Sequence, residues 1–214
     1  MTFGPGDEQR HRPGPDPSWS ETWSFDVWAT DGSVGVFTWL TFVPALRRAW
    51  YWSVLVRSGE RQLHVADVDA PMPQTGLRVR TTGLWAEHVC EVPFEQWTVQ
   101  NECYAVALDE PADALDRGYG ESTPIAADLE WYAAAPPVPV PAGYRQAGEA
   151  HAVIELAGGP FTLVGPAGRR HTWGRLAGDG PAPDGSPAYL RAGDLVVTRV
   201  LTPDGWWTQI SPTR

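Results

Sequence analysis

Predicted strands near the start of the chain are apolar on both faces, which restricts the folds open to it. In the segment 34–43, Val36 and Leu40 alternate with Phe37 and Trp39, and the next predicted strand repeats the pattern. A strand with one face in water is apolar only at alternate positions. Both faces therefore need cover, from a second layer, from an N-terminal arm or from an apolar ligand held in a cavity.

Turn signals between alternating runs predict successive β-hairpins. An Asp-Gly pair favours a type I′ turn, whose two central residues both have positive φ. Only the short segment 109–118 has helical character, so the chain is predicted to be all-β: an antiparallel β-sandwich or barrel. The first predicted hairpins join 22–30 to 34–43 through Asp31-Gly32, and 48–57 to 61–68 through Ser58-Gly59.

Changes in composition divide the chain into four predicted segments. Residues 1–18 are rich in Gly, Pro and charged residues, and they are expected to form a disordered N-terminal arm. Residues 19–134 contain the long alternating runs of the main sandwich or barrel. The Pro-rich stretch 135–143 favours polyproline II and is predicted to be a linker. Residues 144–214 contain shorter runs, which are expected to form a small second β unit.

The charge balance disfavours several classes of partner. The 214-residue chain has 16 basic residues, all of them Arg, against 26 Asp plus Glu, which gives a net charge of −10. That sign disfavours nucleic acid, whose phosphates attract clustered cations, and also anionic membrane surfaces. No apolar stretch approaches the roughly 18 residues of a membrane span, and the first residues lack the apolar core of a signal peptide. A cytoplasmic location without membrane insertion is therefore predicted, and homo-oligomer formation stays open.

The sequence contains no motif for a metal or a cofactor. Cys90 and Cys103 are the only cysteines, and their spacing matches no zinc site, so both are predicted to be reduced. A G-x-S-x-G elbow, a phosphate loop and a dinucleotide fingerprint are also missing. We therefore predict no metal and no cofactor, and any chemistry would come from side chains alone.

Two neighbouring predicted strands carry polar residues among apolar ones. His88 shares one face of its strand with Cys90, and on the following strand Glu102 shares a face with Tyr104. If this second face points inward, Glu102 beside His88 would form an acid–base pair in a dry cavity, where burial raises the pKa of a carboxyl group. If it points outward, it is an ordinary solvated face. The pattern leaves both alternatives open.

A second polar group lies in the segment 169–175. Arg169, His171, Trp173 and Arg175 share one side of this predicted strand, so an imidazole, an indole and two guanidinium groups lie together. Such a grouping could bind a carboxylate or polarise a carbonyl through charge-assisted hydrogen bonds. The alternative is a surface strand whose arginines pair with the many carboxylates of the chain.

The 12 tryptophans are unusually many for 214 residues. Indole offers a large flat surface and one hydrogen-bond donor, which suits a pocket for a semi-polar ligand. The alternative is that they are ordinary core and edge residues. The candidate ligand-binding residues are Trp52, Trp97, Tyr104, Trp173 and Arg175.

Several stretches between residues 20 and 176 carry a family likeness. They are WSFDVWATDGSVGVFTWL, RRAWYWSVLV, GLWAEHVCEVPFEQWTV with ALDEPADAL, and GRRHTWG. In order and spacing they resemble the lipocalin-like family that includes hydroxyneurosporene synthase and many actinobacterial proteins. The resemblance implies a β-sandwich or barrel followed by a second lipocalin-like barrel, with polyene-like substrates hydrated, cyclised or rearranged in a chamber without a cofactor. The second barrel is expected to be abbreviated here, because the chain ends soon after the last motif.

Three functions are compatible with these observations. The first is an enzyme that encloses a lipophilic terpenoid, polyketide or acyl-type molecule and promotes hydration or cyclisation. His88, Glu102 and His171 would transfer protons, and Arg175 would orient a polar group of the substrate. The second is a non-catalytic carrier that only binds such a molecule. The third is a structural subunit without a ligand.

Overall fold

A computed structural model describes residues 2–110, 113–114, 119–140, 142–175, 188–192, 195–202 and 205–212, with side chains as far as Gly174. Within these ranges the chain is almost entirely antiparallel strand, and the short 3-10 turns include η1 (Pro5–Glu8) and η2 (Pro44–Leu46). The all-β prediction is confirmed. None of the helical segments in this described part has the length and apolar character of a membrane span.

Eleven strands form one large sheet and three more form a small one. The large sheet contains β1 (Trp19–Trp28), β2 (Val34–Val43), β3 (Arg48–Arg57), β4 (Leu63–Pro71), β5 (Arg78–Arg80), β6 (Leu84–Val92), β7 (Gln96–Leu108), β8 (Gly120–Ala133), β9 (Val138–Val140), β10 (Gly143–Leu156) and β11 (Gly159–Arg175). The small sheet contains β12 (Ala188–Ala192), β13 (Leu195–Thr202) and β14 (Gly205–Pro212).

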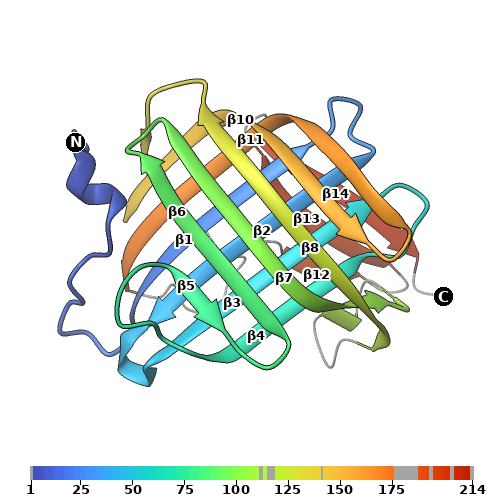
Figure 1. Ribbon diagram of the computed structural model, residues 1–214, viewed down its shortest axis with the longest axis horizontal. Coiled ribbons are helices and arrows are strands. Elements are labelled where there is room, and N and C mark those ends of the chain that lie inside the picture. Colours follow the sequence, from blue (N-terminus) through green and yellow to red (C-terminus); the bar gives the residue numbers. More distant parts are fainter. Residues whose placement is uncertain are drawn as a thin grey trace.

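The large sheet closes on itself as a barrel (Figure 1). Its strands follow the order β4-β3-β2-β1-β11-β10-β8-β7-β6-β5, and β9 pairs with β10. A further pairing of β4 with β7, at Leu63 with Ala107 and His64 with Val106, joins the two sides of the sheet. Beyond this point β6 takes over the same edge of β7, with β5 beside it. Closure leaves few unpaired strand edges, and side chains fill the interior.

Alternate positions of the long strands fill the interior of the barrel. On β1, Trp23, Phe25 and Val27 point inward and are at most 1% exposed. Gly148 on β10 leaves room for an indole ring, because a Cβ at this position would lie 2.4 Å from the Trp131 side chain. The core is thus unusually aromatic. Its largest fully buried side chains are Trp23, Trp97, Trp131, Tyr51, Tyr144, Phe25 and Phe42.

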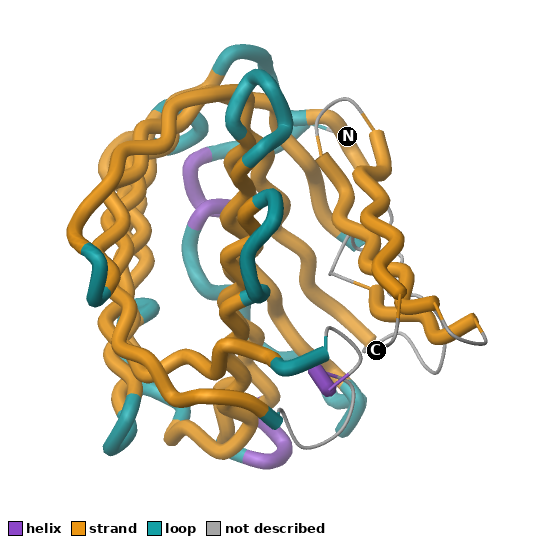
Figure 2. The backbone as a smooth tube through the Cα atoms, turned by 90° about the vertical axis from the view of Figure 1, so that its right-hand side faces the viewer, coloured by secondary structure: helices purple, strands orange, loops and turns teal. Residues whose placement is uncertain are grey.

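The outward faces of β1, β2 and β3 are covered as well. Trp28, Phe37 and Val54 point away from the barrel interior, yet each is buried. The three-stranded sheet β12–β14 lies beside this wall of the barrel in both views (Figures 1 and 2). Of the alternatives that the doubly apolar strands raised, a second layer therefore describes this wall.

The barrel does not end at the predicted linker. β9 lies within the stretch 135–143 and pairs with β10, while β11 pairs along β1 and completes the ring. Residues 143–175 therefore belong to the same barrel as residues 19–133, and the predicted boundary needs correction. The physical reason is that β1, at the start of the meander, would otherwise expose an unpaired edge.

The N-terminal arm is also different from the expectation. Residues 5–8 form η1, and the side chain of Glu8 is completely buried against the barrel. Arg10 donates to the carbonyl of Pro73 at 2.9 Å and lies over the Phe42 ring. The arm is ordered because a few specific polar contacts hold it, although its composition offers little apolar surface.

The first hairpin turn differs from the predicted type I′ geometry. Gly32 has a φ of +71°, but Asp31 is not in the positive-φ region. β1 ends at Trp28, two residues before the predicted end, so the connection is longer and needs only one left-handed residue. Asp31 instead accepts hydrogen bonds from the backbone and the hydroxyl of Ser33.

Candidate functional site

A buried ion pair attaches the arm to the barrel. Arg169 on β11 points inward, and its Nη1 donates to Glu8 Oε2 at 2.9 Å while Nη2 contacts Oε1. Gln146 accepts from Arg169 Nε at 3.0 Å and from Nη2 at 2.7 Å. The Glu8 carboxylate also accepts from the backbone N–H of Phe94 at 3.1 Å. Two charges removed from water are tolerated when such additional hydrogen bonds satisfy them.

Aromatic rings surround the guanidinium group of Arg169. Its Cζ lies 4.9 Å from the centroid of the Trp131 ring and 5.2 Å from that of Tyr144. The rings of Trp97 and Phe94 follow at 5.5 and 5.9 Å. Such contacts stabilise a desolvated cation through the quadrupole of each ring.

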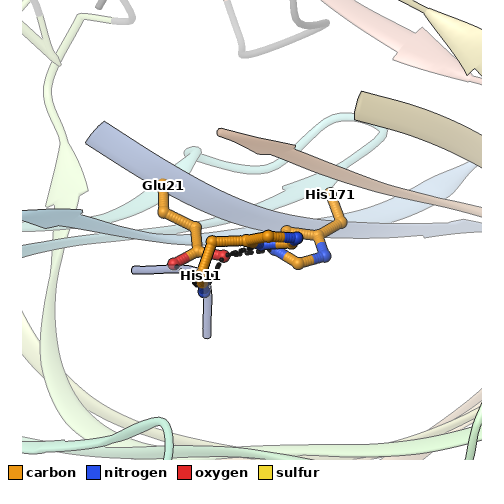
Figure 3. A group of neighbouring side chains, drawn as sticks. All are labelled: His11, Glu21 and His171. Carbon is orange, nitrogen blue, oxygen red and sulfur yellow. Dashed lines mark hydrogen bonds and ion pairs between the residues drawn. The ribbon is translucent and has the colours of Figure 1, made fainter. Parts of the chain in front are cut away.

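A second polar cluster joins the arm to β1 and β11 (Figure 3). Glu21 Oε1 lies 2.7 Å from Nδ1 of His11 on the arm and 2.9 Å from Nε2 of His171 on β11. The backbone N–H of His11 also donates to both oxygens of the Glu21 carboxylate. One carboxylate oxygen thus bridges two imidazole rings from segments 160 residues apart in sequence.

The protonation of this cluster follows from burial and pairing. Burial opposes the charge on Glu21, but hydrogen bonds from His11 and His171 outweigh it, so the pKa of Glu21 is lowered. Burial also acts on His11, yet its contacts with Glu21 and Asp7 raise its pKa. For His171 burial dominates over Glu21, and its pKa is lowered. His11 is therefore the imidazole that shares the charge of Glu21 most readily, and His171 is a neutral partner.

Further contacts fix both rings in place. The His11 ring stacks on Trp173, with centroids 3.8 Å apart, and the His171 ring stacks on Trp23 at 4.6 Å. The outer nitrogens of the two rings also face polar groups: Asp7 Oδ1 lies 3.5 Å from His11 Nε2, and Tyr144 Oη lies 3.4 Å from His171 Nδ1. Together these contacts set which nitrogen of each ring faces Glu21.

The middle of the barrel presents a different kind of polar group. His88 on β6 points inward, is 3% exposed, and neither of its ring nitrogens has a hydrogen-bond partner within the described part of the chain. Burial lowers the pKa of His88 to about 3, so the ring is a neutral imidazole. Its neighbours include the rings of Phe25, with centroids 5.5 Å away, and Tyr51 at 6.4 Å.

Indole groups share this property with His88. The Nε1 atoms of Trp23, Trp97 and Trp131 are buried inside the barrel, and no described residue is their hydrogen-bond partner. By contrast, the hydroxyl of Tyr51 accepts from Thr38 at 3.0 Å and from the amide of Asn101 at 2.8 Å. Most buried polar groups in proteins find a partner, so four unpartnered side chains in one interior require an explanation.

A cleft beside the arm reaches this interior. Its volume is about 580 Å³, within the usual range for sites that bind small molecules. Two inward-facing residues of the barrel, His88 and Trp97, contribute to its wall together with Cys90. The complete lining is Glu8, Gln9, Arg10, Gln74, Thr75, Gly76, Leu77, Glu87, His88, Val89, Cys90 and Trp97.

The structure separates the residues predicted to act together. Glu102 pairs in register with Trp85 on the outward face, whereas His88 pairs with Val99 on the inward face. Glu102 is exposed, so the predicted acid–base pair of His88 and Glu102 does not form. Tyr104 shares the outward face and is 65% exposed. The solvated-face alternative is the correct one for this side of β7.

The other predicted residues divide between the two surfaces. Trp97, His171 and Trp173 point inward, as does Arg169. Trp52 lies on the outward face of β3, half-buried, with its ring 4.4 Å from that of Trp39. The side chain of Arg175 lies outside the described residues.

Three polar residues of the site, Glu8, His11 and Glu21, were not predicted from the sequence, whereas Arg169 was grouped with His171 on one strand face. Glu8 and His11 lie in a segment whose composition resembles disorder, and no local pattern distinguishes them. Glu21 was detectable, because it is in phase with an apolar face: it precedes Trp23 and Phe25 at alternate positions. A charged residue in phase with core residues indicates a buried partner elsewhere in the chain.

The closed antiparallel ring with a mixed aromatic and polar interior defines the class, a lipocalin-like β-barrel. The chain belongs to the family described as "Domain of unknown function (DUF7064)", whose model matches residues 4–176. This range contains η1 and every strand of the barrel, and it ends before β12. No curated protein matches the chain.

Solved structures that are similar to this chain include two of CghA, described as "Crystal structure of CghA with Sch210972" and "Crystal structure of CghA". Each has 15% sequence identity to this chain and a TM-score of 0.41. Each match covers 92% of this chain and 58% of the CghA chain. The chain therefore spans less than two thirds of the length of those proteins.

Proposed function

We propose that the barrel binds a lipophilic small molecule in its interior and that the cleft beside the N-terminal arm is the entrance. The observation that supports this most strongly is the set of interior polar groups, His88 and the indoles of Trp23, Trp97 and Trp131, that have no hydrogen-bond partner among the described residues. A buried polar group without a partner costs about 1–3 kcal/mol. A ligand that supplies the missing hydrogen bonds would remove this cost.

The chemistry of these groups restricts the class of ligand. Neutral His88 offers one donor and one acceptor, and each indole Nε1 offers one donor. A hydroxyl, ketone or ester oxygen on an apolar skeleton satisfies such a set. An isolated carboxylate would have no cation at His88, because burial lowers the pKa of this imidazole to about 3. The ligand is therefore an uncharged terpenoid, polyketide or acyl-type molecule with at least one oxygen.

Hydration or cyclisation of the bound molecule is the second candidate function. The resemblance to the hydroxyneurosporene synthase family supports it. So does an interior imidazole whose nitrogens have no hydrogen-bond partner among the described residues. With a low pKa, His88 is a weak base that would accept a proton only from an acidic centre or orient a hydroxyl group. Binding without turnover, as in a carrier, needs none of this chemistry.

Ligand binding can be tested with native mass spectrometry and thermal unfolding. The panel contains terpenoid alcohols, ketones and esters, with matched alkanes and fatty acids as comparisons. We expect the oxygenated neutral compounds to bind one per chain and to raise the Tm, since a ligand that binds only the native state stabilises it. His88→Leu should weaken their binding, whereas His151→Leu, on the exposed face of β10, should not.

The outcomes distinguish the candidates. A ligand recovered unchanged after long incubation indicates a carrier, and a recovered isomer or hydrate indicates an enzyme. If no compound shifts the Tm, or if alkanes bind as tightly as alcohols and the His88→Leu variant behaves as the wild type, the proposed interior site is wrong. A structural subunit without a ligand would then be the remaining function.

A further inference from the structure

We propose that His11, Glu21 and His171 bind one divalent transition-metal ion such as Zn²⁺, which would hold the N-terminal arm on the barrel. One ligand atom from each of these three residues lies within 4.8 Å of the other two. Two imidazole nitrogens and one carboxylate oxygen form a common set of protein ligands for zinc. The residues come from the arm, from β1 and from β11, so no local sequence motif indicates this site.

Two of the three distances between ligand atoms are slightly shorter than those of a bound site, and the third, between the two imidazole nitrogens, is at most 4.8 Å. His11 Nδ1 and His171 Nε2 lie 2.7 and 2.9 Å from the same oxygen of Glu21. Metal–ligand bonds of about 2.0–2.2 Å place neighbouring tetrahedral ligand atoms roughly 3.2–3.6 Å apart. Side-chain movements of less than about 1 Å around the Glu21 oxygen would admit the ion in place of the shared protons.

The outer contacts of both rings match those of metal-binding histidines. A ligating histidine usually donates its other ring N–H to a carboxylate, a carbonyl or another polar group. Asp7 occupies that position for His11, at 3.5 Å from Nε2, and Tyr144 occupies it for His171, at 3.4 Å from Nδ1. These two contacts are independent of Glu21, and both leave the remaining nitrogen of each ring directed toward the cluster.

The surroundings favour a borderline metal over calcium or magnesium. Ca²⁺ takes six to eight oxygen ligands, and Mg²⁺ prefers octahedral oxygen, whereas this cluster offers two nitrogens and one carboxylate. Stacking on Trp173 and Trp23 holds the rings in fixed orientations. The His11 side chain is 21% exposed and Glu21 only 2%, which gives an ion a path from solvent to a shielded site.

The test uses Zn²⁺ alone, without any lipophilic ligand, so that its result is independent of the proposed binding in the barrel interior. Isothermal titration and elemental analysis of the full chain should show one Zn²⁺ per chain at micromolar affinity or tighter, and Co²⁺ should give the visible absorption of a low-coordinate site. Hydrogen exchange of residues 6–12 should slow when Zn²⁺ is added, because the ion would attach the arm to the barrel.

Variants assign the ion to this cluster. His11→Ala, on the partly exposed arm, and Glu21→Gln should each weaken Zn²⁺ binding by at least about 100-fold, and Tyr144→Phe by about 10–100-fold, which is the usual effect of an outer partner. His151→Ala, which removes an exposed histidine, should leave it unchanged. His11→Ala keeps the test valid if Glu21→Gln does not fold.

Two results would overturn the proposal. One is the absence of stoichiometric Zn²⁺ binding to the folded wild-type chain. The other is binding that His11→Ala leaves intact, which would locate the ion elsewhere on this acidic protein. Either result would identify the cluster as a proton-bridged network that serves only to attach the arm.

Discussion

Two regions of the barrel interior are similarly buried but differ in how their polar groups are satisfied. Under the N-terminal arm, Glu8 forms an ion pair with Arg169, and the Glu21 carboxylate contacts both His11 and His171. Elsewhere in the interior, polar atoms of His88, Trp23, Trp97 and Trp131 have no hydrogen-bond partner among the described residues. The first region resembles a structural attachment of the arm, and the second resembles a ligand-binding site without its ligand.

The difference indicates what each region contributes. The pairs under the arm fix one end of the barrel, so removing a single partner there should destabilise the protein or release the arm. Leaving His88 and the indole N–H groups unpaired lowers stability, and proteins retain such a cost mainly at functional sites. A substitution under the arm should therefore lower both the free energy of unfolding and the affinity for the lipophilic ligand. A substitution of His88 by an apolar residue should raise the free energy of unfolding and lower that affinity.

Breaking the arm ion pair should have the largest effect. Glu8→Ala leaves the Arg169 guanidinium buried without its carboxylate, and such a loss costs about 3–5 kcal/mol. Urea unfolding followed by tryptophan fluorescence would measure this change. The double variant with Arg169→Met should recover most of the loss, because it also removes the unpaired charge. A cost below about 1 kcal/mol for Glu8→Ala would mean that the arm is not held by this pair.

Replacing His88 by an apolar residue should have a smaller effect of the opposite sign. His88→Leu removes two unpartnered nitrogens and should raise the free energy of unfolding by about 1–3 kcal/mol in the absence of ligand. The same urea experiment measures it, with His151→Leu as the control on the exposed face of β10. Destabilisation by His88→Leu would show that a water or a protein group satisfies this imidazole after all, and the comparison between the two regions would fail.

Lowering the pH should destabilise the protein, partly through the titration of His88. The pKa of His88 is lowered to about 3 in the folded chain from 6.5 in the unfolded chain, so between these values only the unfolded state takes up the proton. Stability then falls as the pH is lowered below about 6.5, by about 1.4 kcal/mol per pH unit. His64 acts in the same direction, with a pKa lowered to about 4 by burial.

The variant His88→Leu isolates the contribution of His88 to the pH dependence. Between pH 6 and pH 4 its free energy of unfolding should fall less steeply than that of the wild type, by about 1.4 kcal/mol per pH unit. Urea unfolding at a series of pH values gives both slopes. Equal slopes would mean that His88 already binds a proton in the folded state.

The alternation of residues along the strands was sufficient to predict most of the barrel. The predicted strands 34–43 and 48–57 coincide with β2 and β3, because two-sided apolar runs between turn residues have few alternatives to a covered sheet. The pairing of β1 with β11 was not predictable in this way, since no local pattern specifies which distant strand closes a ring. Because the pairing of β1 with β11 was not recognised, a domain boundary was predicted at 135–143, inside what is one barrel.

The site was less predictable than the fold, for a related reason. Alternation correctly grouped His171 with Trp173, but the partners that decide their chemistry are His11 on the arm and Glu21 on β1. The arm was predicted to be disordered because composition measures the apolar surface that a segment can bury. This segment is held instead by a few specific polar contacts. Whether Glu102 faces His88 stayed open because periodicity shows which residues share a face and not which face is inside.

Substitutions on the outward face of β7 should have the smallest effect. Glu102→Gln and Tyr104→Phe alter side chains that are exposed and face away from His88, so each should change the free energy of unfolding by less than about 0.5 kcal/mol. Neither should alter the affinity for a neutral lipophilic ligand, which His88→Leu should weaken. Urea unfolding and native mass spectrometry with the same ligand measure the two quantities. If Glu102→Gln weakened ligand binding as strongly as His88→Leu, the ligand would lie outside the barrel, in the depression that Glu102 and Tyr104 share with Trp85, because Glu102 and His88 lie on opposite faces of the sheet.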